Sequence, residues 1–324
     1  MIDARIILKA HLAVALCLSS VMVAEAAPGH IYVAIQATSP VQILQIKRFP
    51  LRGNRIQHHA DLMYSNVSAP LATGVGGTLF AGTGTVAPFS TTVITRFPPN
   101  GTHPAFFYRL PVIAGQQSVA TSLAVDANDT LYAGFVAGTA NGVFVFPVGA
   151  HAPTRRIDTD QHVSSLAFDA QGNLCMDLVT HIAAVAHPST NPTLVRAVYA
   201  PTLDSYYEHI RGIAADASGF VFGFNADQVG EYSVLSSGLS EPIYESGYPG
   251  YPIYTNPSLD ENGAASDGEL YLPYNDEYMT RRGILSSGIV QFKIGTVYYG
   301  QNVQTLAFPD FSNNNYVTSV VLGP

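Results

Sequence analysis

Two histidines recur at the same place in a repeated phrase of this sequence. His162 and His209 each stand four residues before the apolar residue that opens the phrase, Leu166 or Ile213. An imidazole titrates near neutral pH and is a common ligand of divalent metals, so a pair of them suits metal binding or proton transfer. The residues of this candidate ligand-binding site are His162, His209, His181, Asp227 and Glu208.

The sequence leaves the chemistry of the candidate site open. A divalent metal is the cofactor that such a set of side chains would hold. Polar residues at junctions between loops and strands are also common without any such role. No His-x-x-x-His or similar ligand spacing falls within one predicted strand, and no serine nucleophile motif is present. The sequence therefore does not decide whether the protein is an enzyme.

Copies of one phrase predict the elements that position these residues. Each copy runs from apolar residues through Asp and a tight turn into a second apolar run, which predicts a β-hairpin. The clear copies span 123–132, 166–174 and 213–222. Their Asp residues stand 43 and 47 positions apart, a period typical of β-propeller blades.

The turns of these hairpins have a predicted chemistry of their own. Asp accepts backbone N–H bonds within a tight turn, and Gly supplies the positive φ that closes it. A structural role, rather than a catalytic one, is therefore expected for these residues. The predicted structural turn residues are Asp126, Asp169, Asp216, Gly172 and Gly219.

Weaker copies of the phrase complete a ring. Residues 71–80 and 264–271 are degenerate copies, and a further copy is split between the two ends of the chain. Residues 316–323 match its first strand, and residues 30–34 match its second. The pattern predicts an all-β fold, a six-bladed β-propeller whose ring is closed by pairing of the N- and C-terminal strands.

The first residues are predicted to be a signal peptide. Residues 10–23 are apolar, and Ala24-Glu25-Ala26 fits the small-x-small rule for cleavage. We therefore expect a signal peptide at 1–26 and a single β-propeller domain at 27–324. The mature protein is then secreted or periplasmic.

The charge composition excludes two classes of binding partner. The net charge is −8 and only 12% of residues are charged, so the chain has no basic surface for nucleic acid or for an anionic membrane. After cleavage we expect no membrane association and a monomer. Cys175 is then the only cysteine, so no intrachain disulfide forms. Its position in the second strand of the repeated phrase predicts partial burial.

The repeated phrase resembles that of NHL-type six-bladed β-propellers and of exported bacterial proteins built from similar blades. The residues that carry the resemblance are 123–132, 166–174, 213–222 and 71–80. The more distant superfamily includes gluconolactonase- and regucalcin-like hydrolases, which hold a divalent metal in the central channel with Glu, Asn and Asp. The matching slots here are Val119, Val163, Ile210 and Val317, with no acidic ligand.

Two classes of function follow from this resemblance and from the residues. The first is an exported, non-catalytic β-propeller that binds a protein, peptide or glycan through its loop face. The second is a metal-assisted, lactonase-like hydrolase or a lyase with a site at the mouth of the central channel. Convergence of three or more of the candidate side chains would favour the enzyme.

Overall fold

The chain folds into short strands that form antiparallel sheets. In the described residues the only helical element is a short 3-10 turn, η1 (Val75–Gly77), and no helix is long and apolar enough to cross a membrane. The computed structural model describes residues 29–37, 43–50, 57–62, 70–84, 91–178, 181–199, 212–215, 220–224, 228–233, 239–245, 264–266, 269–275, 287–293, 304–307 and 315–323.

Each main sheet has four strands, which follow one another from the centre of the molecule outwards. The sheets, in this order, are β26 (Asn315–Gly323), β1 (His30–Ala37), β2 (Ile43–Pro50) and β3 (Gln57–Leu62); β4 (Leu71–Thr73), β5 (Leu79–Gly84), β6 (Thr91–Phe97) and β7 (Phe106–Arg109); β10 (Val119–Val125), β11 (Leu131–Ala137), β12 (Ala140–Phe146) and β13 (Arg155–Thr159); β14 (Ser165–Phe168), β15 (Leu174–Asp177), β16 (His181–Ala186) and β17 (Thr193–Tyr199); β18 (Gly212–Ala215), β19 (Phe220–Phe224), β20 (Gln228–Ser233) and β21 (Leu239–Glu245); and β22 (Ala264–Ser266), β23 (Glu269–Asn275), β24 (Ser287–Lys293) and β25 (Gln304–Ala307).

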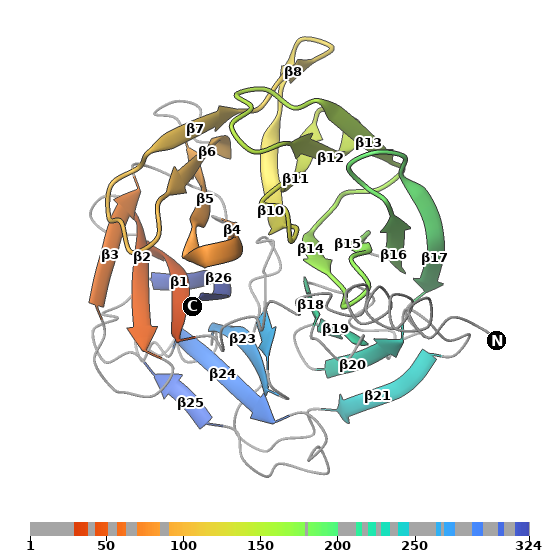
Figure 1. Cartoon of the computed structure of the whole chain (residues 1–324). Coiled ribbons are helices and arrows are strands. Elements are labelled where there is room, and N and C mark those ends of the chain that lie inside the picture. Colours follow the sequence, from red (N-terminus) through yellow and green to blue (C-terminus); the bar gives the residue numbers. More distant parts are fainter. Residues whose placement is uncertain are drawn as a thin grey trace, which may run out of the picture.

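The sheets stand around a common axis, as Figure 1 shows. Their first strands lie nearest the axis and contact one another in turn: β4 contacts β10, β10 contacts β14, and β14 contacts β18. Further contacts join β18 to β22, β22 to β26, and β26 to β4. The arrangement is a β-propeller, which confirms the predicted architecture at this level.

The two ends of the described chain pair in one sheet. Strand β1 pairs antiparallel with β26, from His30 opposite Gly323 to Ala37 opposite Asn315. The Gly29 N–H adds a hydrogen bond to the Gly323 carbonyl at 2.9 Å. The split phrase thus forms one hairpin-like unit from residues far apart in sequence, as its pattern predicts.

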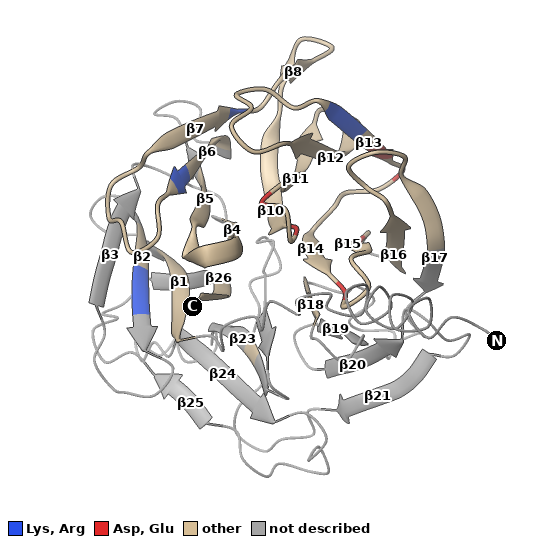
Figure 2. Cartoon of the chain, in the orientation of Figure 1, with Lys and Arg blue, Asp and Glu red and all other residues tan. Residues whose placement is uncertain are grey.

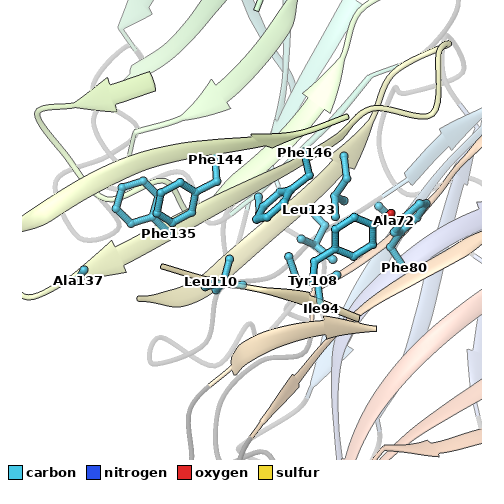
Figure 3. Close-up of a cluster of buried hydrophobic side chains, with 13 residues drawn as sticks. Ala72, Phe80, Ile94, Tyr108, Leu110, Leu123, Phe135, Ala137, Phe144 and Phe146 are labelled. Carbon is cyan, nitrogen blue, oxygen red and sulfur yellow. The ribbon is translucent and has the colours of Figure 1, made fainter. Parts of the chain in front are cut away.

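Neighbouring sheets are held together by aromatic packing. One core cluster lies between the β4–β7 and β10–β13 sheets (Figure 3). Phe135 and Phe144 stack with ring centroids 4.0 Å apart, and Tyr108 meets Phe146 edge-on at 5.5 Å. Burial of one such ring stabilises the fold by about 1.5–3 kcal/mol relative to its exposure. Tyr108 belongs to β7 and Phe146 to β12, so their contact joins adjacent sheets.

Cys175 belongs to a separate buried cluster. The prediction of partial burial was wrong, because the thiol of this β15 residue is fully enclosed among Ile182, Ala184 and Ile213. Burial, and secondarily the Asp169 carboxylate, raises the pKa of the thiol well above its usual range. Cys175 therefore stays a neutral thiol and acts as a small apolar side chain.

Candidate functional site

The two ends of the propeller differ in their connections. Consecutive strands of each sheet run antiparallel, so their connections alternate between the ends. The turn face carries the β10–β11, β12–β13 and β14–β15 turns, which contain Asp126 and Asp169. The loop face carries the β11–β12 and β15–β16 turns and the connections from β7 to β10 and from β13 to β14.

At the turn face, Asp126 closes the β10–β11 turn. Its Oδ1 accepts the N–H of Asn128 at 2.8 Å and that of Thr130 at 2.9 Å. The Tyr132 hydroxyl donates to Oδ2 at 3.2 Å. Burial, together with the Asp126 charge, raises the pKa of Tyr132, so the phenol remains a donor. All these contacts join residues within the β10–β11 hairpin.

Asp169 has the same arrangement in the β14–β15 turn. Its Oδ1 accepts the N–H groups of Gln171 at 3.0 Å and Asn173 at 2.8 Å, and its Oδ2 accepts the Asn173 side-chain amide at 2.8 Å. Gly172 closes this turn with a φ of 77°. The other predicted turn residues, Asp216 and Gly219, lie outside the described residues.

Two of the predicted site residues lie at the loop-face end of the β14–β17 sheet. His162 is part of the short connection from β13 to β14 and is partly buried. His181 begins β16, is buried, and accepts the Leu178 N–H at its carbonyl, 2.9 Å away. The remaining predicted residues, His209, Asp227 and Glu208, lie outside the described residues.

A carboxylate that the sequence reasoning missed lies at the same end. Asp177, the last residue of β15, is fully buried. The Ser164 hydroxyl donates to Asp177 Oδ2 at 2.6 Å, and the Ser164 N–H donates to the Asp177 carbonyl at 3.0 Å. Ser164 follows His162 by two residues, Asp177 ends β15, and His181 begins β16. This end of the sheet therefore gathers two imidazoles, a carboxylate and a hydroxyl.

A positional signal for Asp177 was present in the sequence. In the β10–β13 sheet the matching residue is Gly134, because Gly134 pairs with Ser122 as Asp177 pairs with Ser165. Small or apolar residues fill this slot in the other copies of the phrase. A charged residue in an otherwise apolar slot indicates a special role, as buried charges are rare unless they are paired.

The chemistry open to this end of the sheet is limited by its burial. A carboxylate and imidazoles can orient a polar ligand or transfer a proton. Within the ranges that the structure describes, no three His, Cys, Asp or Glu side chains are placed to hold one metal ion. Asp177 is fully buried, so direct contact between its carboxylate and a ligand would require local movement of the surrounding chain.

Hydroxyl side chains of the inner strands join neighbouring sheets instead of lining a free surface. Thr121 Oγ1 donates to the Val163 carbonyl at 2.5 Å, and Ser319 Oγ accepts the Leu71 N–H at 3.2 Å. The exception is Ser122, whose buried hydroxyl has no hydrogen-bond partner. A Ser precedes three copies of the phrase, as Ser122, Ser165 and Ser319, and in two of them its hydroxyl contacts the backbone of the next sheet.

A small hairpin projects from the loop face. Strands β8 (Val112–Ile113) and β9 (Gln116–Gln117) form a separate two-stranded sheet between β7 and β10, beyond the outline of the ring in Figure 1. Ala114 and Gly115 have φ values of 48° and 80°, the positive values of a tight hairpin turn. A positive φ is uncommon for a residue other than glycine, so the turn at Ala114 is strained.

The hairpin lies beside the β11–β12 turn and forms a neutral surface with it. A Cβ on Gly138 would stand 3.1 Å from Gln116 Cγ, which places the two segments in contact. Val112 is 60% exposed. Neither the hairpin nor residues 137–141 contain a charged side chain (Figure 2). We call residues 112–117 and 137–141 the neutral loop surface.

Comparison with known proteins identifies the fold and no family. No protein-family model matches the chain, and no curated protein matches its sequence. A protein of unknown function from Bacteroides caccae is similar in structure, with a TM-score of 0.57 at 10% identity, over 92% of this chain and 99% of its own. A functionally unknown protein from Desulfotomaculum acetoxidans has a TM-score of 0.54 at 14% identity, over 89% of each chain.

A virginiamycin B lyase from Staphylococcus aureus, solved as an inactive variant with quinupristin, is more distant. Its TM-score is 0.47 at 13% identity, over 74% of this chain and 76% of its own. The first two similarities support the β-propeller fold. At such identities they establish nothing about activity.

Proposed function

We propose that this chain is an exported, non-catalytic β-propeller that binds a protein or peptide through the neutral loop surface. The observation that carries the proposal is the β8–β9 hairpin. Only residues 160–164 separate β13 from β14, so an outer strand can reach the next inner strand without a hairpin. The hairpin is therefore an addition that ring construction does not need.

The composition of the hairpin favours a protein partner. It combines an exposed Val112, exposed glutamines and a strained turn at Ala114, in a chain of net charge −8. Backbone strain that persists at an exposed position is a feature of recognition sites. A neutral surface with apolar exposure suits contact with another polypeptide, because contact there does not desolvate charge.

Matched charge substitutions test this proposal. Val112→Glu places a charge on the neutral loop surface, whereas Val148→Glu places one on an equally exposed valine, 57% exposed, in the β12–β13 turn of the opposite face. Peptides selected against the mature chain from a random display library serve as the probe. We expect Val112→Glu to abolish their binding and Val148→Glu to leave it intact, with both variants equally stable. Equal binding by the two variants would reject the loop surface.

We also propose that the ring has six blades of NHL-like type and that residues 1–26 are removed on export. The cyclic order of contacts between inner strands and the β1–β26 pairing support the ring count. Deletion of 316–324 should then abolish cooperative thermal unfolding, and an unchanged transition would contradict the closed ring. N-terminal sequencing of exported protein should begin at Ala27.

A second candidate function rests on Asp177. A fully buried carboxylate beside Ser164, at the same end of the sheet as His181, suits acid–base chemistry in a hydrolase or lyase. Asp177→Asn keeps the size of the side chain and removes its charge. If a lactone or ester substrate is found, loss of turnover in this variant with unchanged stability would favour the enzyme over the binding protein.

A further inference from the structure

We propose that Asn100 is the acceptor of an N-linked oligosaccharide. Asn100-Gly101-Thr102 has the Asn-x-Thr pattern of such acceptors, with a residue other than proline in the middle. The three residues belong to the connection from β6 to β7, at the turn face. The modification rests on the export proposed above, because it belongs to exported proteins. It does not depend on the neutral loop surface, which lies at the other face.

The backbone of this connection holds the Asn100 side chain at the tip of a turn. The Gly101 N–H donates to the Pro98 carbonyl at 2.8 Å, which closes a four-residue turn. Pro99 stands second in it and Asn100, with a φ of 57°, stands third, the order typical of a type II turn. Asn100 and Thr102 are both exposed. Since Pro99 and a backbone bond fix the turn, the Asn100 carboxamide is available to an enzyme.

The transfer to Asn100 needs one donor, an oligosaccharide linked to a lipid through a diphosphate. An oligosaccharyltransferase catalyses the step. A bond forms between Asn100 Nδ2 and C1 of the first sugar, and the bond between that carbon and the diphosphate breaks. Nδ2 loses one proton, and the lipid diphosphate is the leaving group.

A second match to the pattern, Asn128-Asp129-Thr130, lacks the accessibility of the first. Thr130 is only 8% exposed. Its N–H donates to Asp126 Oδ1 at 2.9 Å, and its carbonyl accepts the Asp126 N–H at 3.1 Å. The pattern requires the threonine hydroxyl, so an enzyme that cannot reach Thr130 cannot use Asn128. A third match, at 66–68, lies outside the described residues.

The surface around Asn100 is one that an oligosaccharide would cover. Residues 97–108 contain no Asp, Glu, Lys or Arg, and Phe107 is 50% exposed. Phe106 stacks on His151 with ring centroids 4.2 Å apart, which brings the β12–β13 turn, with its exposed Val148, beside this connection. Sugar hydroxyls are hydrated and uncharged, so they would shield apolar side chains without adding to the net charge of −8.

Mass spectrometry of the protein from its natural source tests the proposal. The N-terminus is sequenced, and peptides are compared before and after treatment with a peptide N-glycosidase, which removes the glycan and converts Asn to Asp. We expect a chain that begins at Ala27, with occupancy at Asn100 about tenfold higher than at Asn128. A chain that begins at Ala27 with an unmodified Asn100 would overturn the glycan and leave the export intact. A chain that keeps residues 1–26 would refute the export and, with it, the glycan.

Substitutions in the pattern complete the test. Variants of 27–324 are secreted from a eukaryotic host behind that host's signal peptide. Thr102→Ala should abolish the glycan, Thr102→Ser should retain it, and Asn128→Gln, the matched control, should leave it unchanged. Each variant is first checked for parental thermal unfolding, and Asn100→Asp, which tolerates a positive φ, replaces Thr102→Ala if that variant fails to fold. A glycan that persists in Thr102→Ala, or equal occupancy of Asn100 and Asn128 in the parent, would overturn the proposal.

Discussion

The β10–β13 and β14–β17 sheets are copies of one unit that make the same turn with different residues. In the β14–β15 turn, Gly172 adopts a φ of 77°. In the β10–β11 turn the same position is Asp129, which adopts a φ of 58° despite its side chain. Asp129 also contacts the neighbouring sheet, because its Oδ1 accepts the Val75 N–H at 2.7 Å.

One copy of the phrase thus has Asp where another has Gly, and this Asp contacts the neighbouring sheet. The left-handed conformation at Asp129 costs about 1 kcal/mol, and the bond to Val75 offsets that cost. The same bond explains Gly74, which stands where the consensus has Asp. A Cβ on Gly74 would collide with Asp129 Oδ1. Loss of the consensus residue in one copy therefore accommodates the altered residue in the next.

A second contrast concerns the loop-face ends of the two sheets. In the β10–β13 sheet, Gly134 leaves room for Thr121 and Ser122, and the Ser122 hydroxyl is unpartnered. In the β14–β17 sheet, Asp177 occupies the position of Gly134 and accepts the Ser164 hydroxyl. A buried carboxylate with a donor is thus confined to one of the two copies, where a functional role can be sought.

The largest loss of stability is expected when the Asp of the repeated phrase is restored at Gly74. Gly74→Asp would place a new carboxylate against that of Asp129, and we expect a loss of about 3 kcal/mol in the free energy of unfolding. Urea unfolding measures it. The double variant Gly74→Asp with Asp129→Gly should recover more than half of the loss. A fully stable single variant would refute the proposed coupling between the two turns.

The second largest loss of stability is expected from removal of the Asp carboxylate that both turns share. Asp169→Ala removes the acceptor for two backbone N–H groups and one side-chain amide, with an expected cost of about 2 kcal/mol. Asp126→Ala should behave alike, because its carboxylate also accepts three donors. Asp169→Asn retains the Oδ1 acceptor and should cost less than half as much. If Asp169→Ala instead lost peptide binding at full stability, the carboxylate would belong to the functional site.

Substitutions of the turn residue at positive φ, Gly172 or Asp129, should change the free energy of unfolding by a smaller amount. The change should differ between the two sheets. Gly172→Asp introduces left-handed strain with no neighbour to contact, so we expect a loss of about 1 kcal/mol in thermal or urea unfolding. Asp129→Gly removes strain and a hydrogen bond together, and its net effect should stay within about 0.5 kcal/mol. A gain of about 1 kcal/mol in Asp129→Gly would show that the Val75 contact contributes nothing.

The smallest effect is expected at the inner strands. Ser122→Ala removes a buried hydroxyl that has no partner, so the stability should stay unchanged or rise by up to about 1 kcal/mol. Ser319→Ala removes the acceptor of the Leu71 N–H and should cost about 1 kcal/mol. Calorimetry of the two variants gives the comparison directly. A clear loss in Ser122→Ala would reveal a hydrogen bond to an ordered water.

Much of the architecture could be predicted from local sequence. The Asp residue, the Gly or Asp three positions later and the flanking apolar runs define a hairpin, because its hydrogen bonds connect residues close in the chain. The split copy at 30–34 and 316–323 predicts the β1–β26 pairing for the same reason: each half needs a partner of that pattern. The positions of His162 and His181 at the loop face follow from strand alternation alone.

Other features depend on neighbours distant in sequence, and only the tertiary structure decided them. Gly74 is small because Asp129 approaches from another sheet, and Asp177 is tolerated because the Ser164 hydroxyl donates to it. The exposure of Leu194 and Val195 likewise depends on which strand is outermost. A repeat pattern determines the local hydrogen bonds and the period, whereas packing between copies determines which departures from the pattern are allowed and which side chains remain available for partners.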